Sequence, residues 1–122
     1  MPFDWREYFD LAKELQGQTS EAAQRSSISR AYYAVFGTAK NHLKTKGVIF
    51  SNTGEEHMLV WNRFLNSRAA CREIGSLGDR LRRRRTRADY ENVMENVGKE
   101  AENAIQDATE FFELLAQRPN CP

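Results

Sequence analysis

The chain has 122 residues, 40% of them hydrophobic, with 18 Lys and Arg against 17 Asp and Glu and a formal net charge of +1. This length predicts one domain, and the balanced charge argues against a uniformly basic nucleic-acid binder. The aromatic content argues against a disordered chain, and no apolar run approaches the roughly 18 residues that predict a membrane span. We expect a single cytoplasmic domain over residues 1–122, without a membrane association, in which residues 118–122 form a disordered tail.

Helix signals begin at the N-terminus, and the prolines lie only near the two ends, which leaves the interior free for long helices. The first helix is predicted over residues 4–16, with Asp4 as its N-cap and Glu7 completing a capping box. The second begins near Thr19 or the following serine and ends in lysines before Gly47, as the helix dipole and the glycine C-cap preference favour. It spans about 40 Å at about 1.5 Å per residue.

The middle of the chain is predicted to hold two shorter helices. A loop over residues 47–53 precedes a third helix, which Asn52 or Thr53 caps. The helical pattern weakens over residues 66–78, which contain two glycines, so we predict a connection there. A short fourth helix then starts near Ser76.

The last predicted helix covers residues 97–117. Its apolar residues recur at alternating steps of four and three, the pattern of a seam between packed helices. Several are alanines, which allow a neighbouring helix to approach closely. The predicted fold class is therefore all-α, an antiparallel up-and-down bundle of four to five helices.

A dense run of arginines precedes an acidic segment. The run contains Arg80, Arg82, Arg83, Arg84, Arg85 and Arg87. Residues 88–122 hold eight acidic residues against Lys99 and Arg118. The run is interpreted either as a phosphate-binding strip or as a solvated face paired with the acidic last helix. Helical spacing places Arg84 or Arg85 on the inward face, where Asp89, an acid of the last helix or a bound anion must neutralise the charge.

Histidines and cysteines give little sign of a metal site or a cofactor. His42 and His57 are the only histidines, and neither has a His or Cys one helical turn away, so no metal ligand set is predicted. Cys71 and Cys121 are distant in the sequence and are expected as reduced thiols. The aromatic cluster of residues 32–36 is interpreted as core with one exposed hydroxyl, and stacking on bases is the alternative.

Four segments together resemble the HEPN domain superfamily over nearly the whole chain. They are Ser-Arg-Ala-Tyr-Tyr-Ala-Val-Phe at residues 29–36, Lys-Gly at 46–47, His57 with the apolar stretch to Phe64, and Arg-Thr-Arg-Ala-Asp-Tyr at 85–90. The resemblance implies a helical bundle, usually dimeric, found in prokaryotic proteins often encoded beside a minimal nucleotidyltransferase or in toxin and defence systems. Many such relatives are metal-independent ribonucleases.

The resemblance also implies a set of site residues. In the nucleases an arginine is followed a few residues later by a histidine; Arg85 matches the arginine, and Tyr90 stands where the histidine is expected. The candidate catalytic residues are therefore Arg85, Tyr90 and His57. The candidate ligand-binding residues are Arg30, Arg84, Arg85, Arg87, Asp89 and Tyr90.

Three functions follow as hypotheses. The first is a homodimeric HEPN-type module that holds RNA or a nucleotide at Arg85, with Asp89 orienting the arginine and Tyr90 stacking or donating a hydrogen bond. The second is a metal-independent ribonuclease toxin that uses Arg85 with Tyr90 or His57. The third is an interaction module whose basic strip docks an acidic partner such as a nucleotidyltransferase-type antitoxin.

Overall fold

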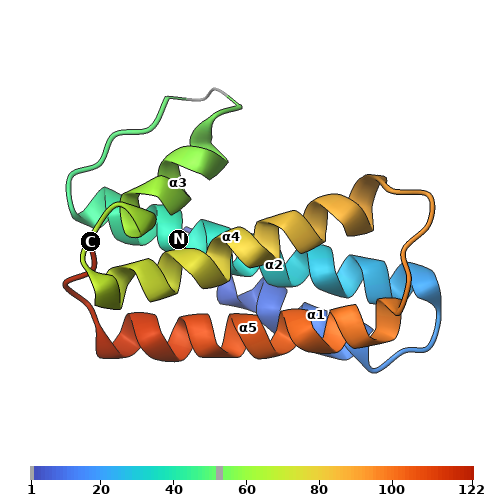
Figure 1. Cartoon of the computed structure of the whole chain (residues 1–122). Helices are drawn as coiled ribbons and strands as arrows, with labels where there is room; N and C mark the ends of the chain where they lie inside the picture. The colour runs from blue at the N-terminus through green and yellow to red at the C-terminus, as the bar shows by residue number, and fades with distance from the viewer. Residues whose placement is uncertain (1, 52–53) are drawn as a thin grey trace.

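The computed structural model describes residues 2–51 and 54–122, and over these residues it is all-helical. The helices are α1 (Arg6–Gln16), α2 (Glu21–Thr45), α3 (Glu56–Leu65), α4 (Ala69–Tyr90) and α5 (Val97–Gln117). Four of them, α1, α2, α4 and α5, run up and down alongside one another, and the shorter α3 packs at the end where α2 finishes (Figure 1). The predicted all-α bundle is confirmed.

The predicted cap of α2 is confirmed, because the Ser20 hydroxyl accepts a hydrogen bond from the Ala23 N–H at 3.1 Å. The N-cap predicted at Asp4 is wrong, since α1 begins at Arg6 with Trp5 as its N-cap; the Asp4 carboxylate instead accepts from the Arg6 N–H at 3.0 Å, just before the helix. At the other end of α2, Gly47 adopts a φ of 90°, the left-handed conformation that glycine tolerates after a helix. The loop cap predicted at Asn52 or Thr53 lies outside the described residues.

The connection predicted over residues 66–78 is wrong, because α4 starts at Ala69 and continues through both glycines. These glycines mark close packing against α3. A Cβ atom on Gly78 would lie 2.2 Å from the Trp61 ring, and one on Gly75 would lie 2.8 Å from the Phe64 Cβ. Burial of these aromatic side chains outweighs the low helix propensity of glycine.

The expectation of reduced thiols is also wrong, since Cys71 and Cys121 form a disulfide with a Cα–Cα distance of 5.4 Å. Both cysteines are fully buried. The residues after α5, expected to be disordered, are held here: His42 Nε2 hydrogen-bonds to the Cys121 carbonyl, and Arg118 donates to the Ala70 carbonyl at 2.8 Å. Antiparallel packing of α4 and α5 brings cysteines 50 residues apart into contact, a proximity that sequence spacing does not reveal.

The core lies around α2, whose inward residues pack against α1, α4 and α5. The largest fully buried side chains of the core are Trp61, Tyr32, Phe64, Phe111, Ile28 and Leu43. Among the described residues, no helix is both long and apolar enough to cross a membrane. The core therefore fixes α2 and α4 side by side, with α3 against both near Trp61.

Candidate ligand-binding site

The arginine run is divided between two faces of α4, and one face is neutralised by α5. The Asp107 carboxylate accepts hydrogen bonds from Arg80 at 2.9 and 2.7 Å and from Arg84 at 2.9 Å. The Glu100 carboxylate accepts from Arg84 at 3.1 Å and from Arg87 at 2.6 Å. Steps of four and three residues place these arginines on one side of the helix. Arg84 and Arg87, both predicted as ligand-binding residues, thus have carboxylate partners within the chain.

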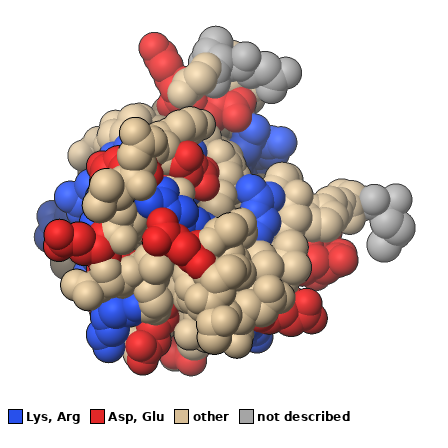
Figure 2. Space-filling model, turned by 90° about the vertical axis from the view of Figure 1, so that its right-hand side faces the viewer, with Lys and Arg blue, Asp and Glu red and all other residues tan. Residues whose placement is uncertain are grey.

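This ion-pair network changes the titration of its central acid. Burial works to raise the pKa of Asp107, but the hydrogen bonds from Arg80 and Arg84 outweigh it, so the pKa lies below its ordinary value. Arg84 is only 9% exposed, so its charge depends on these partners. Figure 2, which shows the end of the bundle where α4 passes into α5, displays basic and acidic side chains interleaved.

Arg85 lies on a different face of α4, directed towards the tyrosines of α2. Its guanidinium carbon is 5.4 Å from the ring centroid of Tyr32, 5.5 Å from that of Tyr33 and 5.9 Å from that of Tyr90. Within the described part of the chain, its one carboxylate contact is with Asp89, at 3.6 Å. The buried Nε atom of Arg85 has no hydrogen-bond partner there. Aromatic faces therefore hold this arginine in place of close carboxylates, and some of its donors remain unused.

Hydrogen bonds connect the surroundings of Arg85 to Ser29 and Arg30 of α2. The Ser29 hydroxyl donates to Asp89 Oδ2 at 3.2 Å, and Arg30 Nη2 donates to the Ser29 oxygen at 3.4 Å. The Arg30 guanidinium lies between the rings of Tyr8 and Tyr33, 4.7 and 5.1 Å from their centroids. Two arginines from different helices thus share the Tyr33 ring, and Asp89 connects α4 to α2.

His57 reaches the same cluster from α3 through a short hydrogen-bond chain. The Trp61 indole N–H donates to the Tyr32 oxygen at 3.1 Å, and that oxygen lies 2.5 Å from His57 Nδ1. Burial raises the pKa of Tyr32, which therefore keeps its proton, while burial and the positive charge of Arg85 lower the pKa of His57. Tyr32 and His57 therefore share one hydrogen bond, and the tautomer of the imidazole decides which of the two atoms donates.

Tyr90 marks the exposed edge of the cluster. It is the last residue of α4 and is 75% exposed. The end of α4 is held by Arg25, which donates to the Ala88 carbonyl at 3.0 Å and to the Glu91 carbonyl at 2.6 Å. The phenol is therefore presented to solvent from a fixed helix end.

The predicted site residues therefore separate into two groups. Arg30, Arg85, Asp89, Tyr90 and His57 gather around the α2 tyrosines, whereas Arg84 and Arg87 turn to α5. Sequence reasoning assigned the tyrosines of residues 32–36 chiefly to the core and did not include Trp61; adjacent aromatic residues beside a Ser-Arg pair are the signal that points to them. Over residues 2–51 and 54–122, no group of three or more His, Cys, Asp or Glu side chains is placed to hold a metal ion.

Comparison with models of protein families identifies the family of this chain. The model of the HEPN domain family matches residues 7–118, which is nearly the whole chain. The chain therefore belongs to the HEPN domain family. Searches of curated proteins and of solved structures gave no match.

Proposed function

We propose that this HEPN-domain protein binds RNA or a nucleotide at the cluster around Arg85, as part of a toxin-antitoxin or defence system. The observation that carries the proposal is the environment of Arg85. It is 12% exposed, faces three tyrosine rings and lacks the close carboxylates that neutralise Arg84. A phosphate would supply the missing anion through charge-assisted hydrogen bonds.

The surroundings suit a nucleotide better than a bare anion. His57 brings an imidazole to the cluster, Arg30 adds a second positive charge, and Tyr90 presents an exposed ring. Tyr33 and Phe36 also line an adjoining cavity of about 380 Å³. Proteins hold single-stranded RNA by combining side chains that donate hydrogen bonds to the phosphates with aromatic rings that stack on the bases.

Fluorescence anisotropy of a labelled single-stranded oligoribonucleotide tests this proposal. Arg85→Ala should weaken binding by about 10- to 100-fold, the range expected for one charge-assisted phosphate contact. Arg83→Ala is the matched control, because this neighbouring side chain is exposed and, among the described residues, its one ion pair is with Asp79, at 3.5 Å. Affinity should fall as salt is raised. The proposal is refuted if the protein has no affinity for RNA or nucleotides, or if the Arg85 and Arg83 variants bind equally well.

A metal-independent ribonuclease toxin is the second candidate, and the proximity of His57 and Arg85 across Tyr32 favours it. As a general base His57 needs a ring nitrogen that carries no proton, so the tautomer that forms in the hydrogen bond with Tyr32 decides whether it can accept a proton from RNA. Incubation of RNA with the protein in EDTA measures cleavage directly. Cleavage that His57→Gln abolishes would establish the nuclease; RNA that stays intact would leave binding as the function.

The proposal includes two protein partners, a second copy of the chain and a nucleotidyltransferase-type antitoxin. The ion pairs of Arg80, Arg84 and Arg87 with α5 reduce the charge available for docking an acidic surface. Light scattering would detect the homodimer, and co-purification with the product of an adjacent gene would detect the antitoxin.

A further inference from the structure

Basic side chains without partners gather at one end of the bundle, away from the arginine run. Among the described residues, five have no ion pair, side-chain hydrogen bond or aromatic contact: Lys44, Lys46, Arg63, Arg68 and Arg72. They belong to the last turn of α2 and its C-cap, the last turn of α3, and the N-cap and first turn of α4. These segments meet near the C-terminus (Figure 1). These five positive charges are therefore available to meet an anion.

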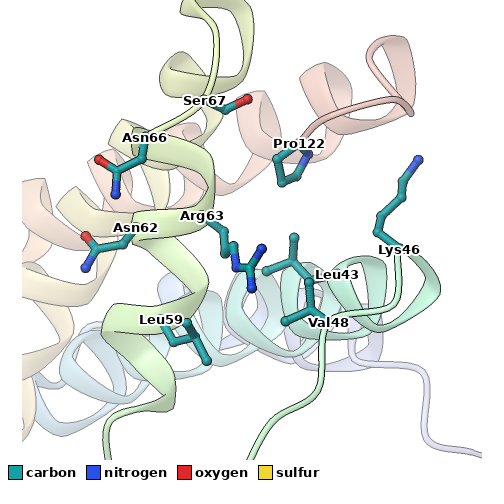
Figure 3. Close-up of a pocket in the computed structure, with 9 residues that line it drawn as sticks. All are labelled: Leu43, Lys46, Val48, Leu59, Asn62, Arg63, Asn66, Ser67 and Pro122. Atoms are coloured by element: carbon teal, nitrogen blue, oxygen red, sulfur yellow. The ribbon is translucent and has the colours of Figure 1, made fainter.

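A cavity of about 470 Å³ opens beside two of these cations, Lys46 and Arg63. It is lined by Leu43, Lys46, Val48, Leu59, Asn62, Arg63, Asn66, Ser67 and Pro122. The Arg63 side chain extends from α3 towards Leu43 and Val48 on the α2 side, and Pro122 lies above them (Figure 3). Pro122 follows Cys121, whose disulfide to α4 keeps this wall of the cavity in place.

The residues that line the cavity restrict which kind of ligand can fill it. A bare anion would leave the Leu59 and Val48 side chains uncovered, whereas an apolar ligand would bury the Arg63 charge without a partner. The amides of Asn62 and Asn66 and the Ser67 hydroxyl can hydrogen-bond the edge of a ring. The cavity also falls within the range of about 300–1,000 Å³ that is typical of small-molecule sites.

We propose that this cavity binds a nucleoside monophosphate unit, with the phosphate on Arg63 and Lys46 and the base against Val48 and Leu59. The site is separate from the Arg85 cluster. Ser67 borders the cavity just before α4 begins, and Arg85 lies about 24 Å further along that helix at about 1.5 Å per residue. The two sites can therefore be tested independently.

Nuclear magnetic resonance titration of the disulfide-bonded protein with adenosine and uridine 5′-monophosphate tests the proposal. Saturable shifts should appear at the amides of the cavity residues, with a Kd below about 1 mM. Inorganic phosphate and the unphosphorylated nucleosides should each bind at least about tenfold more weakly, since each fills half of the site. A 5′-phosphorylated tetraribonucleotide identifies the source: tighter binding than the monophosphate indicates an RNA end, and equal or weaker binding indicates a free nucleotide.

Variants separate this site from the Arg85 cluster. Arg63→Gln and Lys46→Gln should weaken binding at the cavity by about tenfold. Lys99→Gln is the control, because it removes one positive charge from an exposed position on α5. Arg85→Ala should leave nucleotide binding at the cavity unchanged. The cavity proposal therefore stands or fails independently of the proposed binding at Arg85. Absence of shifts at the cavity, or equal binding by the Arg63 and Lys99 variants, would overturn it.

Discussion

Replacing Asp107 by asparagine removes one negative charge from the ion-pair network between α4 and α5 while keeping the shape of the side chain. Asp107 accepts three hydrogen bonds, two from Arg80 and one from the buried Arg84. Asparagine presents one oxygen and one NH₂ group, so at least one arginine then faces a donor. After the change, Arg84 keeps only Glu100 as a carboxylate partner.

The expected loss follows from this geometry. Removing one partner of a buried ion pair costs about 3–5 kcal/mol when the other charge is left alone. Because Arg84 retains Glu100 and the Arg80 side chain is half-exposed, we expect a loss of about 2–4 kcal/mol in the free energy of unfolding. Urea denaturation followed by far-ultraviolet circular dichroism at pH 7 would measure it.

Asp89→Asn is the matched control for this measurement. It makes the same chemical change on α4, but Asp89 is more exposed, lies 3.6 Å from Arg85 and leaves that guanidinium against the tyrosine rings, so a smaller loss of about 1 kcal/mol is expected. Equal losses for the Asp107 and Asp89 variants would refute the division of the arginine run into a structural face and a ligand-facing one.

Three further predictions concern stability. Because the pKa of His57 is lowered below 6.5 in the folded protein, the unfolded chain binds a proton first as the pH falls; the free energy of unfolding should decrease between about pH 7 and 5, and less so in His57→Gln. Reducing the disulfide should lower the free energy of unfolding by about 2–4 kcal/mol, measured by urea denaturation with and without dithiothreitol. Equal denaturation midpoints under the two conditions would contradict a contribution from the disulfide. Gly78→Ala should lower the melting temperature, because the new methyl group meets the buried Trp61 ring, whereas Gly98→Ala should raise it, since a Cβ there meets open space. A Gly78 variant as stable as the parent protein would show that the helices can move apart at little cost.

Local signals in the sequence were sufficient for most of the helices. The start of α2 after its N-cap Ser20 and its end before Gly47 follow from capping chemistry, and the alternating steps of residues 97–117 predict α5. The first half of α4 could not be predicted in this way. Gly75 and Gly78 resemble turn residues until Phe64 and Trp61 of α3 are known to pack against them. The disulfide was missed for the same reason, because it depends on how α4 and α5 pair.

For the candidate site, the sequence predicted only that Arg84 or Arg85 faces inward and that its charge needs a partner. Consecutive residues on a helix point about 100° apart, so Arg84 and Arg85 cannot face the same neighbour. The sequence left open which of the two faces inward, and the structure shows that both are largely buried on different sides. That the partner of Arg85 is a set of tyrosine rings depends on the alignment of α2 with α4, which no local pattern specifies.

The indole of Trp61 gives the candidate site an intrinsic optical probe. Its N–H donates to Tyr32, whose ring faces Arg85 and whose oxygen holds His57. The second tryptophan, Trp5, lies in contact with Gly37 on the N-terminal side of the molecule, so Trp5→Phe would leave a single buried emitter. The fluorescence emission of Trp61 could then report both ligand binding at Arg85 and unfolding of the same unlabelled protein.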